Sequence, residues 1–151
     1  MILLFLILNL IIAIKSRLPD HTYIPTSDCQ FEVHKDGPDG VLVEGAEIDM
    51  QLYYKIQCKP VDGYCLKVSN CTVSPDSSSH EASYPIIDSE GCSLEKSLYE
   101  DVQYTDDFTA GIVNPFPIRF RSSSSAVIFY CATSLQPRDS KFGKCSHPKC
   151  S

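Results

Sequence analysis

Eight cysteines and four histidines are the residues of this 151-residue chain whose types and spacing could carry chemistry. A cysteine thiolate beside a histidine base can act as a nucleophile, and cysteines together with a histidine can bind zinc. An even number of cysteines can instead form disulfides, which would make the chain a structural building block. The cysteines are Cys29, Cys58, Cys65, Cys71, Cys92, Cys131, Cys145 and Cys150.

The N-terminal segment bears on this choice, because it indicates the compartment of the protein. Ile2–Ile14 is apolar except for one residue, and it is shorter than the roughly 20 residues that span a bilayer. It predicts a signal peptide over residues 1–16. Lys15 and Arg17 follow the apolar run, whereas signal peptides carry their positive charge before it, so a buried helix or a short anchor is the alternative. Export favours four disulfides.

A catalytic cysteine has little support in the sequence. No recognisable nucleophile motif surrounds any of the eight cysteines, and exported cysteines are usually paired. Ser77–Ser79 before His80 reflects a serine-rich composition and not a triad. Pairing two acidic residues for acid–base catalysis requires a structure. We therefore expect no catalytic residue.

A zinc site is the second alternative, and Cys145, His147 and Cys150 form the one group with suitable spacing. Structural zinc sites usually repeat a closely spaced cysteine pair, and no second pair of this kind accompanies the group. A Cys145–Cys150 disulfide with His147 exposed between the cysteines is the better interpretation. We therefore expect no metal ligand.

The overall charge narrows the range of partners. The formal net charge is −6, and removal of residues 1–16 with Lys15 would make it −7. An acidic surface argues against binding to nucleic acid or to anionic membranes. The sequence contains no phosphate-binding loop, dinucleotide fingerprint or calcium loop. We expect no cofactor, no small-molecule substrate and no membrane span.

Two alternating segments predict strands. Gln51–Cys58 and Tyr64–Val73 each alternate apolar and polar residues, and residues 59–63 between them contain a Pro and an Asp-Gly turn signal. Together they predict a hairpin. Cys58 and Cys65 flank its loop closely enough to be cross-linked.

The remaining segments complete an antiparallel sandwich. Arg17–Asp28 has no periodicity and predicts a linker, residues 17–28. Tyr84–Ile87 predicts a short strand with Pro85 near its start, which suits an edge strand or the first position of a strand, because Pro cannot donate a backbone hydrogen bond. Ala126–Thr133 is the most apolar run after residue 16 and predicts a central strand. Ser93–Tyr99 could form one helical turn. Short strands separated by Gly, Pro, Asp and Ser turns predict an all-β antiparallel sandwich.

Asn70-Cys71-Thr72 matches the acceptor pattern for N-linked glycosylation. Asn70 shares its strand face with Leu66 and Val68, so a regular strand would turn it toward the core. A bulge near Cys71 would release Asn70 to the surface. The sequence thus leaves two alternatives, a glycosylated Asn70 or an unmodified Asn near a strand end.

The cysteine-bearing segments resemble the C-terminal half of a zona pellucida (ZP) module, ZP-C, and most closely the cuticlin-like group. The resemblance covers residues 29–151 and rests on six segments in order, DCQFEV, LYYKIQC, YCLKVSNCTVS, YPIIDSEGC, IRFRSSSSAVIFYC and KCSHPKC. It implies an immunoglobulin-like β-sandwich stapled by disulfides and no catalysis. It also implies that the cysteines are framework residues.

Two disulfide pairing schemes are implied by the resemblance. The first consists of Cys71–Cys92, Cys145–Cys150, Cys58–Cys65 and Cys29–Cys131. The second contains Cys71–Cys131 and Cys92–Cys150. We favour the first scheme because it permits the hairpin bridge, although spacing alone leaves the connectivity open.

The resemblance implies a secreted structural protein of an extracellular matrix such as a cuticle. We expect its partners to be other ZP-module or matrix proteins or further copies of itself, docked through exposed strand edges. A full ZP module also has a polymerising N-terminal half, and the short linker before Cys29 leaves no room for it, so self-assembly is an open expectation. The alternative is a monomeric module that binds one protein ligand. A secreted enzyme is the third hypothesis and would require a free thiol.

Overall fold

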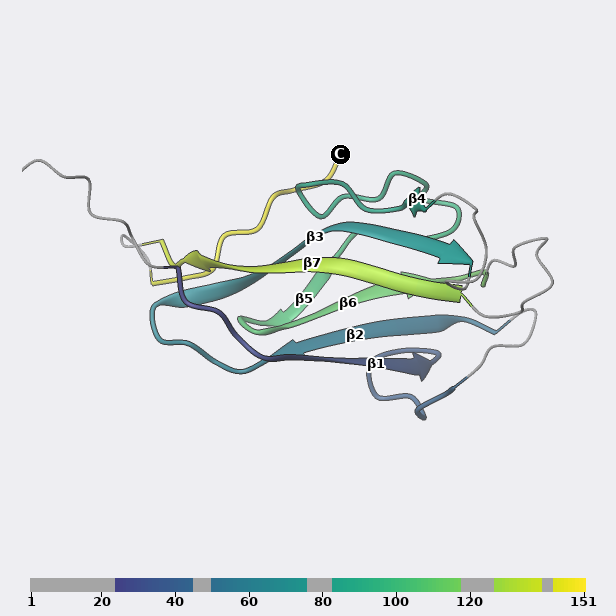
Figure 1. The fold of residues 1–151 in the computed structure, drawn as a ribbon, viewed down its shortest axis with the longest axis horizontal. Coiled ribbons are helices and arrows are strands. Elements are labelled where there is room, and N and C mark those ends of the chain that lie inside the picture. The colour runs from purple at the N-terminus through teal and green to yellow at the C-terminus, as the bar shows by residue number, and fades with distance from the viewer. Residues whose placement is uncertain (1–23, 45–49, 76–82, 118–126, 140–142) are drawn as a thin grey trace, which may run out of the picture.

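The computed structural model describes residues 24–44, 50–75, 83–117, 127–139 and 143–151. These residues form seven strands and no helix (Figure 1). The strands are β1 (Cys29–Lys35), β2 (Leu52–Cys58), β3 (Tyr64–Pro75), β4 (Tyr84–Pro85), β5 (Gln103–Asp106), β6 (Thr109–Asn114) and β7 (Val127–Pro137). None of the described residues belongs to a helix that is long and apolar enough to cross a membrane.

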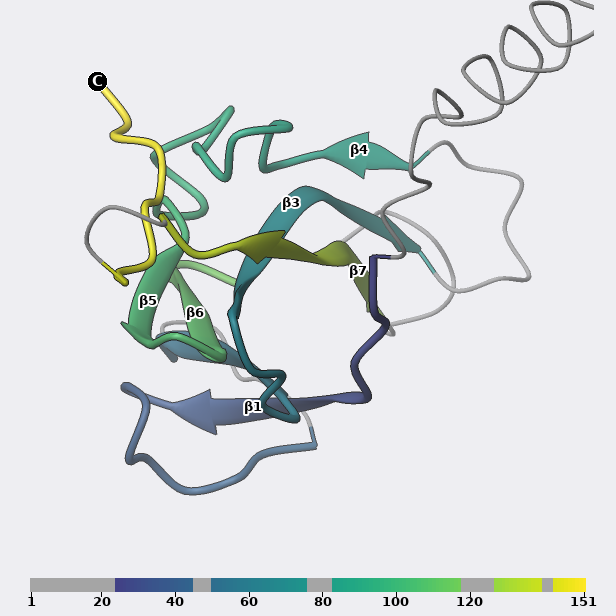
Figure 2. The same ribbon diagram turned by 90° about the vertical axis from the view of Figure 1, so that its left-hand side faces the viewer.

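The strands form two antiparallel sheets, which confirms the predicted all-β sandwich. Sheet A has the order β1-β2-β6-β5, and sheet B has the order β4-β3-β7. Figure 2 shows β3, β4 and β7 on one side of the molecule and β1 on the other. Because both sheets are antiparallel, each can bury one face and leave the other to solvent.

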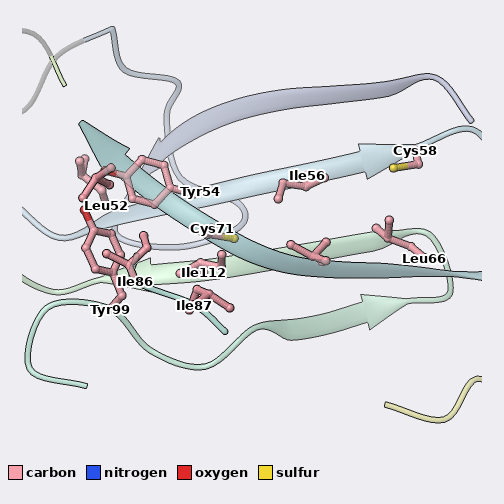
Figure 3. Close-up of a cluster of buried hydrophobic side chains, with 13 residues drawn as sticks. Leu52, Tyr54, Ile56, Cys58, Leu66, Cys71, Ile86, Ile87, Tyr99 and Ile112 are labelled. Atoms are coloured by element: carbon pink, nitrogen blue, oxygen red, sulfur yellow. The ribbon is translucent and has the colours of Figure 1, made fainter. Parts of the chain in front are cut away.

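The core lies between the inner faces of the two sheets (Figure 3). Strand alternation explains its composition, since every second residue of β2 and of the first half of β3 is apolar and points inward. Leu66 and Val68 are completely buried, and each such side chain stabilises the fold by about 1.5–3 kcal/mol. Tyr99, Ile87 and Ile112 fill the same cluster.

The predicted hairpin between Gln51–Cys58 and Tyr64–Val73 is wrong. β2 lies in sheet A and β3 lies in sheet B, so residues 59–63 carry the chain from one sheet to the other. The physical reason is that both edges of β2 are already occupied. β1 pairs with one edge and β6 with the other, which leaves no backbone groups of β2 for β3.

The prediction that Ala126–Thr133 forms a central strand is also wrong. β7 is the terminal strand of sheet B among the described residues, and it pairs with β3. Its outward-facing Ile128 and Tyr130 are 42% and 62% exposed, so the apolar run does not mean burial on both faces. Of the two positions predicted for Tyr84–Ile87, the structure has the edge, since β4 pairs with β3 at the end of sheet B among the described residues.

Ser93–Tyr99 forms turns and not a helix. The Tyr99 N–H donates to Glu95 O at 3.0 Å, and the Ser93 hydroxyl donates to Tyr99 O at 2.6 Å, which closes the segment on itself. The predicted signal peptide 1–16, most of the predicted linker 17–28 and His80 lie outside the described residues.

Candidate functional site

All eight cysteines form disulfides, and two of these bonds lie within a sheet. Cys29 and Cys58 are directly opposite each other on β1 and β2, with their Cα atoms 3.9 Å apart. Cys71 on β3 bonds to Cys131 on β7, with their Cα atoms 4.0 Å apart. Each bond therefore locks one pair of neighbouring strands in register.

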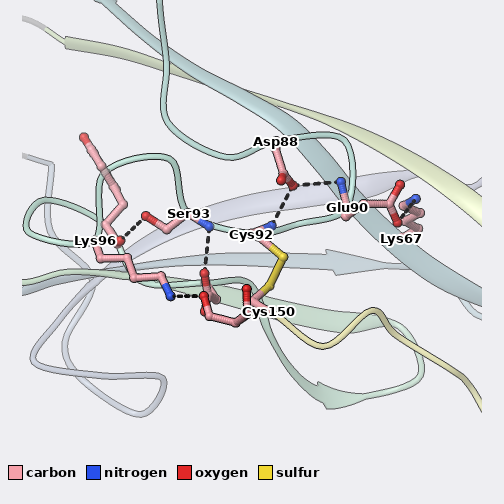
Figure 4. Close-up of a disulfide and its surroundings, with 10 residues drawn as sticks. Lys67, Asp88, Glu90, Cys92, Ser93, Lys96 and Cys150 are labelled. Atoms are coloured by element: carbon pink, nitrogen blue, oxygen red, sulfur yellow. Dashed lines mark hydrogen bonds and ion pairs between the residues drawn. A yellow bond between two sulfur atoms is a disulfide. The ribbon is translucent and has the colours of Figure 1, made fainter.

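The other two disulfides attach the C-terminal segment, residues 143–151, to the sandwich. Cys145 bonds to Cys65 on β3, with their Cα atoms 5.8 Å apart. Cys150 bonds to Cys92 in the loop after β4, with their Cα atoms 5.5 Å apart (Figure 4). The Lys96 ammonium also donates to Ser151 O at 2.8 Å. The C-terminal segment is thus held at both of its ends.

The pairing scheme that we favoured from the sequence is wrong. None of its four bonds is present, whereas both named bonds of the second scheme, Cys71–Cys131 and Cys92–Cys150, are. The favoured scheme relied on a hairpin that does not form. The proximity of Cys145 and Cys150 in sequence was equally misleading, because the segment between them runs along the sandwich and brings each cysteine to a different partner.

We call the boundary between β5 and the first half of β3 the covered seam, because the C-terminal segment lies across it. The seam consists of Cys65, Tyr104, Asp107, Cys145 and His147. The ring of His147 stacks on Tyr104 with centroids 3.5 Å apart, and the Tyr104 hydroxyl accepts the Val68 N–H at 2.9 Å. The Leu66 N–H donates to Asp107 O at 2.8 Å. These bonds satisfy backbone donors of β3 that β4 does not reach.

Charged groups line a cavity of about 430 Å³ at the covered seam. Arg138 Nη2 lies 2.6 Å from Asp107 Oδ2, and both side chains are partly exposed. His147, which we predicted to be exposed, is partly buried. Burial lowers the pKa of His147, and the nearby Asp107 carboxylate opposes this effect. The sulfur atoms of Cys65 and Cys145 lie close to Asp107, but their disulfide leaves no thiolate to bind a metal.

The loop that presents Cys92 is ordered by the carboxylate of Asp88 (Figure 4). Asp88 Oδ1 accepts the N–H groups of Glu90 and Cys92 at 2.8 and 2.9 Å. The hydrogen bond from the Cys92 N–H is the largest effect that lowers the pKa of Asp88. Sequence reasoning missed this residue, although an Asp followed closely by Gly91 is a common turn signal.

We call the boundary between β1 and β7 the aromatic seam, which consists of Phe31, Tyr54 and Phe129. Phe129 stacks on Tyr54 with ring centroids 4.4 Å apart and on Phe31 with centroids 5.4 Å apart. The stack reaches the surface at Phe31, which is 47% exposed. Stacked rings therefore occupy this boundary.

The strand β7 borders the aromatic seam and contains no charged residue along its 11 positions. Tyr130 pairs with Thr72 and Ile128 pairs with Ser74, so the two exposed apolar side chains lie on the outer face of sheet B beside small hydroxyl residues. The result is a long, uncharged strand at the end of sheet B, as far as the described part of the chain shows.

Asn70 lies in a bulge of β3, as the sequence predicted for an exposed Asn70. The register of β3 and β7 shifts between Ser69 and Thr72, so Asn70 and Cys71 together oppose Cys131. Asn70 has a φ of 48° and an exposed side chain. The bulge separates its orientation from that of Leu66 and Val68.

Comparisons with known proteins identify the family of this chain. The family model of the cuticlin C-terminal domain matches residues 25–151. The chain is 29% identical to Cuticlin-3 of Caenorhabditis elegans over 130 residues, and 30% identical to Cuticlin-4 of the same organism over 138 residues. These alignments cover 85% and 88% of this chain but only 32% and 25% of the relatives, so the chain spans about a third of their length or less. The chain belongs to the cuticlin C-terminal domain family.

Proposed function

We propose that the chain is a secreted structural component of a cuticle-type extracellular matrix, without enzymatic activity. Family membership and the names of the relatives support this role. Four disulfides support export, since such bonds persist in oxidising compartments. In this proposal residues 1–16 are a signal peptide, residues 17–28 a linker and residues 29–151 a ZP-C-like domain. Asn70 carries an N-linked glycan.

The proposed role in assembly rests on one observation, the uncharged edge of β7. Edge strands of soluble proteins are usually protected by charges, prolines or bulges of their own, because an unprotected edge pairs with other chains. β7 has no charged residue, and Pro137 stands at its end. An extended segment of another matrix chain can add to such an edge through backbone hydrogen bonds. The partners would be cuticlins or other ZP-module proteins, including further copies of this chain.

Placing a positive charge on this edge tests the proposal. Tyr130 is 62% exposed, so Tyr130→Lys is expected to preserve the fold while discouraging strand addition. Gln57→Lys is the matched control, because Gln57 is exposed on the outer face of β2, an inner strand of sheet A. The secreted proteins are mixed with a full-length cuticlin, and assembly is measured by pelleting and size-exclusion chromatography.

We expect the wild type and Gln57→Lys to enter the assembled fraction and Tyr130→Lys to remain soluble. Equal assembly of all three proteins would show that the protein does not assemble through the edge of β7. A wild-type protein that stays monomeric and binds a single protein ligand would favour the alternative, a binding module without self-assembly.

A further inference from the structure

The three residues of the glycosylation sequon are all fixed in the fold. The Asn70 N–H donates to Asp88 O at 2.8 Å, and Cys71 is completely buried in its bond to Cys131. Thr72 pairs with Tyr130 on β7 and with Pro85 on β4. The Asn70 side chain is accessible, but the backbone that carries it is held on both sides.

This placement matters for the enzyme that would attach a glycan. A transferase that recognises Asn together with a hydroxyl residue two positions later must bind the intervening backbone in its own active site. β3 is the middle strand of sheet B, so Thr72 would have to leave two neighbouring strands. The Cys71–Cys131 bond prevents β3 from separating from β7 at this point.

We infer that glycosylation of Asn70 competes with formation of the Cys71–Cys131 disulfide, so that the glycan is added before this bond closes or not at all. The inference concerns the accessibility of the sequon and goes beyond the proposed role in assembly. It rests on the proposed export only in so far as both reactions occur in the secretory compartment.

The two competing reactions are chemically distinct. In glycosylation, the Asn70 amide nitrogen forms a bond to C1 of the sugar of a polyprenyl-diphosphate oligosaccharide. The C1–O bond breaks, the diphosphate leaves with the electron pair, and a base takes one amide proton. In disulfide formation, the Cys71 and Cys131 thiols lose two protons and two electrons, and a protein disulfide of the export compartment is reduced to a dithiol.

The chain itself sets a time window for the first reaction. Cys131 follows Cys71 by 60 residues. At a synthesis rate of about 5–20 residues per second, Cys131 emerges roughly 3–12 s after Cys71. β7, the neighbour that would trap Thr72, belongs to the same late segment. The sequon is therefore free of both constraints only during and shortly after synthesis.

An assay with purified components tests the inference directly. Unglycosylated protein is made in a bacterial periplasm and incubated with a purified oligosaccharyltransferase and a synthetic polyprenyl-diphosphate oligosaccharide. The samples are the oxidised wild type, the wild type kept reduced and unfolded, and the double variant Cys71→Ser/Cys131→Ser, which retains the sequon as Asn-Ser-Thr. Intact mass reports the fraction that carries a glycan.

We expect the oxidised wild type to be modified at least tenfold less than the reduced wild type and the double variant. The matched control is Cys92→Ser/Cys150→Ser, which lacks a disulfide of similar span, 58 residues, and keeps Cys71–Cys131. If the circular dichroism of the control matches that of the wild type, the control is folded and should not receive a glycan. If the control unfolds, Cys29→Ser/Cys58→Ser replaces it.

Three results would overturn the inference. The first is modification of the oxidised wild type to within twofold of the double variant. The second is the absence of a glycan from both the reduced wild type and the double variant. The third is efficient modification of a folded control. None of these outcomes depends on assembly, so they leave the proposed matrix role untouched.

Discussion

The covered seam and the aromatic seam close the same sandwich at opposite boundaries by different means. At the covered seam, two disulfides hold the C-terminal segment over β5 and β3, and the Tyr104 hydroxyl and Asp107 carbonyl satisfy backbone donors of β3. At the aromatic seam, stacked rings meet without a covalent bond between β1 and β7, and Phe31 is half exposed. The covered seam is cross-linked by disulfides, whereas the aromatic seam is held by side-chain packing without a covalent bond.

The difference indicates where another chain could attach. Covalent closure stabilises a small domain and fixes its shape, but it also occupies the strand edge that it covers. A packed boundary keeps backbone groups and apolar side chains available to a partner. In the proposed matrix role the cross-linked boundary would keep the shape of the domain, and the packed boundary would bind neighbouring chains.

Removing a disulfide of the covered seam should have the largest effect on stability. Cys65→Ser/Cys145→Ser opens a bond between residues 80 apart in sequence and is expected to lower the free energy of unfolding by about 2–5 kcal/mol. Urea denaturation of the secreted protein measures this loss. A loss below about 0.5 kcal/mol, typical of a neutral surface change, would show that the seam is not a source of stability.

Phe31→Ala tests the aromatic seam and should cost less. Truncating a fully buried Phe costs about 3–5 kcal/mol, and Phe31 is 47% exposed, so we expect about 2 kcal/mol. Phe31→Leu, which retains much of the apolar volume, should recover part of this loss in the same urea titration. A loss as large as that of the disulfide variant would contradict the ranking of the two seams.

Tyr104→Phe removes one hydroxyl from the covered seam and keeps the ring that His147 stacks on. The Val68 N–H would lose its acceptor in a buried position, at a cost of about 1–2 kcal/mol. Tyr130→Phe makes the same chemical change at an exposed site beside the aromatic seam and should be neutral. Equal effects in thermal unfolding of the two variants would mean that the Tyr104 hydrogen bond contributes nothing.

The smallest expected effect is the contribution of His147 to the pH dependence of the free energy of unfolding. Burial lowers the pKa of His147, so the unfolded chain takes up this proton first, near pH 6.5, as the pH falls. Stability linked to His147 is therefore fully present above about pH 6.5 and declines as the pH falls toward the folded-state pKa. His147→Gln should flatten the pH dependence of unfolding between about pH 5 and 7. An unchanged slope would argue that His147 is not held neutral by the seam.

Sequence reasoning located the strands of the core but not their neighbours. The alternation of Leu52, Tyr54 and Ile56 shows which face is buried, because side chains on a strand have a period of two. The same alternation contains no information about which strand lies alongside. The hairpin prediction failed for this reason, since β2 pairs with β6, and the paired residues lie 52 to 62 positions apart in the sequence.

The disulfide pairing and the covered seam could not be predicted from the sequence for a related reason. Cys65 bonds to Cys145, 80 residues later, and Tyr104 stacks on His147, with both β6 and β7 between them in the sequence. Such contacts depend on the global arrangement of the chain and leave no local signal. The bulge at Asn70 could be anticipated because it resolves a conflict within one strand, between the exposure that a glycan needs and the face set by Leu66 and Val68.

Hydrogen–deuterium exchange of the secreted protein, alone and assembled with a full-length cuticlin, tests the central claim most directly. The account predicts that assembly slows exchange in β7, Val127–Pro137, and leaves exchange in the C-terminal segment, residues 143–151, unchanged. Slower exchange in the C-terminal segment with no change in β7 would contradict the account, because the cross-linked boundary would then be the one that binds.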